Sequence, residues 1–202
     1  MGCRFATSFR AVVHQGHATA GQWVAVHGCG GIGLSAIMIA EALGAHTIAI
    51  DIADDKLSFA QSIGATQVLN ATEIDNISAA IIELTEGGAH LSIDALGSTI
   101  TCKNSIECLR KRGRHLQVGL MNGEDATPPI PMGRIIGKEI EIVGSLGMQF
   151  HKYPEMFAMI SSGKLRPQEL IGRTVTLEEA ASVLPAMNNF SDTGMSIIEN
   201  LA

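Results

Sequence analysis

A glycine-rich turn is the feature of this 202-residue sequence that points most directly to chemistry. Residues 28–33 read G-C-G-G-I-G, and the glycines of this stretch are Gly28, Gly30, Gly31 and Gly33. In the pattern G-x-G-x-x-G, the first glycine permits a tight turn, the second lets the backbone approach a pyrophosphate, and the third allows close packing of helix on strand. The N-terminus of the following helix offers unpaired N–H groups to an anion. The turn therefore predicts a dinucleotide site.

An acidic residue follows the turn at the spacing that such a site requires. Asp51 closes the next predicted strand, 18 residues after Gly33. A carboxylate at this place accepts hydrogen bonds from the ribose hydroxyls of NAD and repels the 2′-phosphate of NADP. The joint pattern favours an NAD site over the simpler interpretation, a glycine turn beside a solvated surface aspartate.

Other nucleotide chemistries fit the same residues less well. A nucleoside-triphosphate P-loop needs a lysine after its second glycine, but Leu34 and Ser35 follow Gly33, which excludes it. A methyltransferase that binds S-adenosylmethionine stays open, because it also uses a glycine-rich first turn and an acid after the second strand. The Tyr-x-x-x-Lys proton relay of short-chain dehydrogenases is absent, since Tyr153 is followed four residues later by Phe157.

The elements that must position these residues alternate along the chain. Short apolar runs bounded by glycines predict strands at 23–27, 46–51, 67–70, 90–96 and 114–120. Helical spacing predicts helices at 32–43, 54–63, 74–86 and 101–112. A proline-rich loop at 122–134 leads to a sixth strand at 139–145. This alternation predicts an α/β fold, a Rossmann-type doubly wound parallel six-stranded sheet with helices on both faces.

The last part of the chain is predicted to be organised differently. It has a helix at 153–162, a strand at 172–176, a helix at 177–187 and a strand at 195–199, and we expect it not to continue the alternation. The sequence therefore predicts a main domain at 1–164 and a C-terminal tail at 165–202.

Composition excludes several classes of partner. The chain has 14 Lys and Arg against 20 Asp and Glu, a net charge of −6, and its longest basic run spans only 110–114, which argues against nucleic acid. An apolar fraction of 46% with 17% charged residues indicates an aliphatic globular core, not disorder. The four cysteines form no C-x-x-C pair, which favours a reducing cytoplasm over a secreted disulfide framework.

One uncharged stretch has the length of a membrane span. It runs from Trp23 to Ala40, but the glycines of 28–33 and His27 interrupt it, and its periodicity changes there from strand to helix. We therefore predict no membrane span. Nor does the N-terminus carry the pattern of a secretory signal.

Several single residues leave two interpretations open. His27 either borders the cofactor or ends the strand, and Cys29 is either a reactive thiol at a helix N-terminus or a buried one, which is the simpler choice. His14 and His17 are three residues apart and could share a helix face, but no third ligand follows at metal spacing, so a surface pair is favoured.

Four stretches of the chain resemble the cofactor-binding part of zinc-dependent alcohol dehydrogenases of the medium-chain dehydrogenase/reductase superfamily. They are M-G-C-R-F-A-T-S-F-R-A-V at 1–12, A-G-Q-W-V-A-V-H-G-C-G-G-I-G-L-S-A at 20–36, D-I-A-D-D-K at 51–56 and S-I-D-A-L-G at 92–97. The resemblance covers essentially the whole chain. It implies that the full-length enzyme oxidises a small alcohol to an aldehyde or ketone by hydride transfer to NAD.

The resemblance also assigns roles along the chain. It implies that Gly28, Gly30 and Gly33 hold the pyrophosphate and that Asp51 binds the adenosine ribose, with Lys56 at the ribose edge. The remaining residues are implied to contact the two rings: Ile52 and Leu96 the adenine, and Ile32, Thr7, Val118, Leu120 and Leu146 the nicotinamide and its carboxamide. For the apolar residues Ile32, Ile52, Leu96, Val118 and Leu120, a place in the ordinary core stays open.

Cys3 is implied to be the third protein ligand of a catalytic zinc. The other two ligands, and the hydroxyl that relays the substrate proton, would come from a β-rich N-terminal domain. Catalytic zinc requires three protein ligands and one open position, so a single thiolate does not make the site. The resemblance therefore implies an excised cofactor-binding domain with negligible turnover, whose tail resembles strands that return to the missing domain. By residue type alone, Cys3 is a buried or inert thiol.

The sequence differs from the family pattern at one position, and two other functions stay open beside the alcohol dehydrogenase. In many relatives, a basic residue that reaches the pyrophosphate follows the glycine before the last strand, but Met195 follows Gly194 here. A zinc-independent reductase of the quinone or enoyl type and a stand-alone dinucleotide-binding module stay open. Relatives associate through the sixth strand, which implies a homo-oligomer formed through 139–145.

Overall fold

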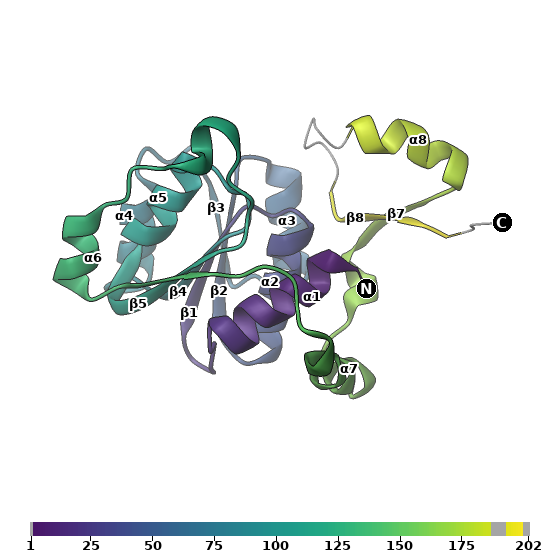
Figure 1. The fold of residues 1–202 in the computed structure, drawn as a ribbon, viewed down its shortest axis with the longest axis horizontal. Helices are drawn as coiled ribbons and strands as arrows, with labels where there is room; N and C mark the ends of the chain where they lie inside the picture. Colours follow the sequence, from purple (N-terminus) through teal and green to yellow (C-terminus); the bar gives the residue numbers. More distant parts are fainter. Residues whose placement is uncertain (1, 187–192, 200–202) are drawn as a thin grey trace.

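Six parallel strands form the central sheet of the computed structural model, which describes residues 2–186 and 193–199 (Figure 1). They are β1 (Trp23–His27), β2 (His46–Asp51), β3 (Gln67–Asn70), β4 (Ala89–Asp94), β5 (Leu109–Gln117) and β6 (Glu141–Gly144). Their spatial order is β3-β2-β1-β4-β5-β6. This order is that of the Rossmann fold, so the predicted fold is confirmed. The order reverses between β1 and β4, which opens a crevice at their carboxyl ends.

Helices cover both faces of the sheet. One face carries α1 (Cys3–Phe9) with its π-helical continuation Arg10–Gln15, α2 (Gly31–Ala42), α3 (Asp54–Ser62) and α7 (Tyr153–Ser161). The other carries α4 (Ile77–Leu84), α5 (Thr99–Glu107) and α6 (Met132–Lys138) (Figure 1). Across residues 2–186 and 193–199, no helix combines the length and the apolar character that crossing a membrane requires.

Strand β1 shows why its apolar run is nearly continuous. Val24 and Val26 point to the face of α2, and Ala25 points to the face of α5. All three are fully buried. Because successive side chains of a strand alternate between the two faces, a sheet covered on both sides requires apolar residues at every position.

Strand β5 begins earlier than the sequence predicts. It starts at Leu109, and α5 ends at Glu107, where a helix to 112 and a strand from 114 were expected. The register shifts between Ala89 and Leu91 of β4, and β5 bulges there, with Arg112 at φ 59°. The bulge turns Arg110, Lys111 and Arg112 toward solvent. Because these three residues are charged, the sequence does not show the apolar pattern of a strand there. Helix α6 lies partly in the segment predicted as a loop.

The C-terminal tail is itself a β-α-β unit. Strand β7 (Ile171–Val175) pairs in parallel with β8 (Met195–Ile198), and α8 (Leu177–Ala186) lies between them in the chain. The expectation that the tail does not continue the alternation is therefore wrong, because parallel strands require such a crossover. The pair forms a separate sheet at one end of the molecule (Figure 1).

A buried histidine lies on the α5 face of β1. His27 is 1% exposed, with its Nε2 3.9 Å from the sulfur of Cys108. Burial, and then the neighbouring His115, lower the pKa of His27 from 6.5 to about 3. The interpretation of His27 as a cofactor neighbour is not supported, because the residue is enclosed in the core.

Acid should therefore destabilise the protein through His27. In the unfolded chain His27 takes up a proton near pH 6.5, but in the folded chain it does so only near pH 3. The contribution of neutral, buried His27 to stability is therefore fully present above pH 6.5 and is lost as the pH falls. We expect the free energy of unfolding of His27→Gln to fall less steeply with pH than that of wild type, by up to about 1.4 kcal/mol per pH unit. Urea denaturation at about pH 7 and about pH 5 measures both slopes. Equal slopes would contradict the assignment.

Candidate functional site

The carboxyl ends of β1, β2 and β4 enclose a cavity of about 250 Å³. Seven of the residues that the sequence assigns to a site line it: Gly28, Gly30, Gly31, Ile32, Asp51, Lys56 and Leu96. Arg4, Ala95 and Gly194 complete its lining. Open α/β sheets bind ligands in this place, outside the carboxyl ends of the strands where the strand order reverses. The fold therefore brings the predicted residues together at the expected crevice.

The glycines of the turn have different structural roles. Gly28 has φ 96°, a conformation that side chains disfavour. A Cβ on Gly33 would overlap the carbonyl oxygen of Gly28, so this glycine lets α2 pack on the end of β1. A Cβ on Gly30 would meet no atom within 4 Å. Gly30 is therefore not required for packing, and its backbone faces the open space of the cavity.

Asp51 ties the end of β2 to the glycine turn. Its Oδ2 accepts a hydrogen bond from the backbone N–H of Cys29 at 2.7 Å. Its Oδ1 accepts from the N–H groups of Ile52 at 2.8 Å and Ala53 at 3.2 Å. The carboxylate remains partly exposed at the cavity. A carboxylate has about four acceptor positions, so it retains capacity for a hydroxyl of a ligand.

A second cavity, of about 460 Å³, lies at the carboxyl ends of β5 and β6. Val118, Leu120 and Leu146 line it, as does Arg10. The guanidinium of Arg10 donates to the carbonyl oxygen of Leu146 at 2.6 Å and so fixes the loop after β6. Sequence reasoning missed Arg10, because this contact joins segments 136 residues apart.

The structure decides which of the apolar site residues belong to the core. Val118 is buried and Ile32 is partly buried against the core. Ile52, Leu96 and Leu120 are 69%, 48% and 68% exposed, so they are not core residues. Large apolar side chains left exposed at the rim of a crevice are typical of a surface that covers a ligand or a partner.

A buried chain of polar side chains supports the loop after β4. Asp94 accepts hydrogen bonds from the N–H groups of Leu96 at 3.0 Å and Gly97 at 2.9 Å. The side-chain amide of Gln117 donates to Asp94 at 2.9 Å. Gln117 also contacts His115, and His115 contacts Ser105, so these side chains form one hydrogen-bonded series. Asp94 thus positions Leu96 at the cavity. Its place after an apolar strand is a turn signal that the sequence analysis did not use.

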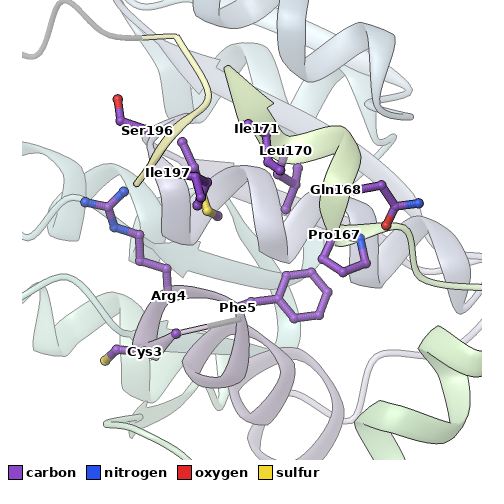
Figure 2. Close-up of a pocket in the computed structure, with 11 residues that line it drawn as sticks. Cys3, Arg4, Phe5, Pro167, Gln168, Leu170, Ile171, Ser196 and Ile197 are labelled. Atoms are coloured by element: carbon purple, nitrogen blue, oxygen red, sulfur yellow. The ribbon is translucent and has the colours of Figure 1, made fainter. Parts of the chain in front are cut away.

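Cys3 lies apart from other possible metal ligands. It is exposed, and its sulfur is 3.5 Å from the hydroxyl of Thr7, which is 3% exposed. The described residues contain no group of three or more His, Cys, Asp or Glu that could hold a metal ion. A third cavity, of about 580 Å³, lies between α1 and the tail, and Cys3 is one of the residues that line it (Figure 2). These residues therefore do not fit a complete zinc site.

The other candidate side chains have structural surroundings. Cys29 is 1% exposed, and burial, then the charge of Asp51, raise the pKa of its thiol, which supports the buried interpretation. His14 contacts Glu155 at 2.7 Å. His17 follows the helix with φ 50°, so the two histidines do not share a helix face.

Comparison with known proteins gives concordant matches. A family model described as zinc-binding dehydrogenase matches residues 31–162. The alcohol dehydrogenase of Geobacillus stearothermophilus is 29% identical over 197 residues, which cover 98% of this chain and 56% of the relative. The NAD-dependent alcohol dehydrogenase of Sulfurisphaera tokodaii is 31% identical over 198 residues, which cover 97% of this chain and 55% of the relative. The chain therefore spans about half the length of these relatives.

Solved structures match over nearly the whole chain. Benzyl alcohol dehydrogenase from Acinetobacter calcoaceticus superposes with a TM-score of 0.89 at 26% identity, over 98% of this chain and 54% of that one. Alcohol dehydrogenase TADH from Thermus sp. ATN1 has a TM-score of 0.88 at 27% identity, over 98% and 57%. The arrangement of strands, helices and tail is therefore shared with these enzymes.

The turn geometry predicts different effects of two matched substitutions. Gly33→Ala should lower the free energy of unfolding by more than about 2 kcal/mol, because its methyl group overlaps backbone that cannot move aside. Gly30→Ala should lower it by only about 1 kcal/mol, because the added methyl group meets open space and only the preference for glycine over alanine at a helix N-cap is lost. Urea denaturation compares the two variants with wild type. Equal losses of stability would contradict the separate roles of the two glycines.

Proposed function

The chain belongs to the zinc-binding dehydrogenase family, and from that premise we propose that it is the NAD-binding part of an alcohol dehydrogenase. One observation carries the proposal: the open backbone at Gly30 and the carboxylate of Asp51 face the same cavity at the point where the strand order reverses. In the complete enzyme, the substrate would be a small alcohol, oxidised to an aldehyde or ketone, or the corresponding carbonyl compound. Bound NAD supplies the acceptor for the hydride.

The adenosine half of NAD fits the first cavity. Backbone N–H groups at the start of α2 are suited to hold the pyrophosphate, with Gly28 and Gly33 giving the turn its shape. Asp51 would accept the hydroxyls of the adenosine ribose, and Lys56 would lie at the ribose edge. The exposed side chains of Ile52 and Leu96 would cover the two faces of the adenine.

The nicotinamide half fits the second cavity. The backbone of Val118 and Leu120 would hold the carboxamide, and the carbonyl of Leu146, fixed by Arg10, would assist. Ile32 would pack near the nicotinamide ring. Thr7, a buried residue in the middle of α1, would border the same ring.

Zinc belongs to this proposal only for the full-length enzyme. Cys3 would be the third ligand, exposed at the start of α1, and the remaining ligands would lie outside this chain. We therefore expect the chain by itself to show negligible alcohol oxidation. The boundary at 165 and a cytoplasmic location stay predictions.

The proposal predicts that the chain prefers NAD to NADP because of Asp51. In calorimetric titration, NAD should bind more tightly than NADP. Asp51→Ala should weaken NAD binding about 10- to 100-fold and abolish the preference, because it removes a charged acceptor and the repulsion of the 2′-phosphate.

Two further variants separate binding from folding. Asp125→Ala is the matched control, because Asp125 is also a carboxylate that accepts a backbone N–H, that of Thr99. This variant should bind NAD like wild type. Gly30→Ala should stay folded but lose NAD affinity, because its methyl group takes the space of the pyrophosphate. Folded wild-type protein that binds neither dinucleotide, or that binds S-adenosylmethionine instead, would overturn the proposal.

The free edge of β6 supports a second proposal, a homo-oligomer formed through this strand. β6 ends the sheet, and Ile142 on it is 46% exposed. An apolar edge strand is a template for pairing with another copy. We expect analytical ultracentrifugation to show a dimer or larger species that Ile142→Lys dissociates. Wild-type protein that remains monomeric at high concentration would refute the pairing.

A further inference from the structure

Arg4 brings a positive charge to the glycine turn from another part of the chain. It lies near the start of α1 and lines the 250 Å³ cavity together with Gly30, Gly31 and Asp51. The protein carries a net charge of −6, so local cations at this cavity would offset the repulsion between the acidic molecule and a doubly charged pyrophosphate. Lys56 is the other cation that lines this cavity among the described residues.

The fourth glycine of the turn makes room for this side chain. Gly31 is not one of the three glycines that the dinucleotide pattern requires, and it is the first residue of α2. A Cβ on Gly31 would lie 2.5 Å from Cδ of Arg4 and 3.3 Å from its Nε and Nη1. The stem and guanidinium of Arg4 therefore pass over the first turn of α2, where unpaired backbone N–H groups lie.

Ser8 holds α1 in the position that this arrangement needs. Its hydroxyl is fully buried and lies 2.8 Å from the carbonyl oxygen of Ile32 in α2 and 2.9 Å from the carbonyl oxygen of Arg4. The contact joins the turn of α1 that carries Arg4 to the first turn of α2. Arg4 is thus positioned by packing between two helices.

The guanidinium of Arg4 has no hydrogen bond or ion pair with another residue in the part of the chain that the structure describes. The carboxylate of Asp51, in the same cavity, already accepts three backbone hydrogen bonds. An arginine has five N–H donors in a planar fork, which matches the oxygens of a phosphate. An unpaired guanidinium over the N-terminus of α2 is therefore suited to an anionic ligand.

We propose that Arg4 binds the pyrophosphate of the dinucleotide, an inference that rests on the proposed NAD site. The residue that follows Gly194 beside the cavity is Met195, which carries no charge. Arg4 also lines the cavity between α1 and the tail, near Ser196 and Ile197 (Figure 2). A purely structural role in holding the tail is the competing explanation that an experiment must exclude.

Calorimetric titration of wild type and Arg4→Met with NAD, ADP-ribose and adenosine tests the proposal. Arg4→Met should weaken NAD and ADP-ribose binding about 10- to 100-fold, because both ligands carry the pyrophosphate. Adenosine, which lacks phosphates, should bind both proteins equally. Arg4→Lys should recover part of the affinity, since it restores the charge without the planar fork. Lys111→Met removes one positive charge near the opposite end of β5 and should bind like wild type.

A double-mutant cycle of Gly31→Ala and Arg4→Met gives a second measurement, in which Gly31→Ala disturbs the contact while Arg4 itself is retained. Gly31→Ala adds a methyl group against the stem of Arg4 and should weaken NAD binding in wild type. The same substitution should have little further effect in Arg4→Met, because the two changes disturb one contact with the ligand. Additive losses would mean that Gly31 acts on the ligand independently of Arg4 and would overturn this part of the argument.

The outcomes separate this proposal from the proposed function. If folded wild type binds no NAD, the proposed function itself fails. If wild type binds NAD and Arg4→Met binds it equally well, the NAD site stands and the role of Arg4 is refuted. An equal loss for adenosine and NAD, or a lowered unfolding temperature in Arg4→Met with unchanged NAD affinity, would assign Arg4 the structural role.

Discussion

The close approach of helix α2 to the end of strand β1 is the constraint on which the site depends. Only a residue without a side chain fits at Gly33, because a Cβ there would overlap the carbonyl oxygen of Gly28. This contact aims the first turn of α2 at the crevice between β1 and β4. The open backbone at Gly30, the link from Cys29 to Asp51 and the packing of α1 through Ser8 are all built around that turn.

The site has two halves that are supported in different ways. Backbone geometry shapes the half at β1 and β2, where Asp51 joins neighbouring loops through three N–H groups. In the other half, Arg10 donates to the carbonyl of Leu146, and Gln117 donates to Asp94 on the neighbouring strand β4. Buried polar groups must be paired to be tolerated, and the hydrogen-bonded side chains from Ser105 to Asp94 connect the two halves, because Gln117 lines the second cavity and Asp94 positions Leu96 at the first.

The placement of charge follows the same division. The molecule as a whole is acidic, yet Arg4 and Lys56 lie at one small cavity and Arg10 lies at the next. Arg4 and Lys56, at the first cavity, would attract a ligand's phosphates locally without giving the molecule a general affinity for polyanions, whereas Arg10 is held by the carbonyl of Leu146. Exposed apolar residues at the same edge, such as Leu120 and Leu146, supply the complementary surface for rings.

The sequence by itself determined the first half of the sheet and the residues of its glycine-rich turn. Strands β1, β2 and β3 have the predicted bounds, because each is a short apolar run preceded and followed by local turn signals. The glycine pattern and Asp51 were also identified from spacing, since a turn and a strand end are set by nearby residues. The six-stranded fold followed from the alternation of such units.

Tertiary structure alone decided the features that join distant segments. The bulge that starts β5 at Leu109, the parallel pairing of β7 with β8, and the exposure of Ile52 and Leu96 depend on neighbours from elsewhere in the chain. Arg4 reaches the turn from a different helix, across 27 residues of sequence to Gly31. Local patterns record which residues prefer a turn, helix or strand, but they hold no information on which segments pack against one another.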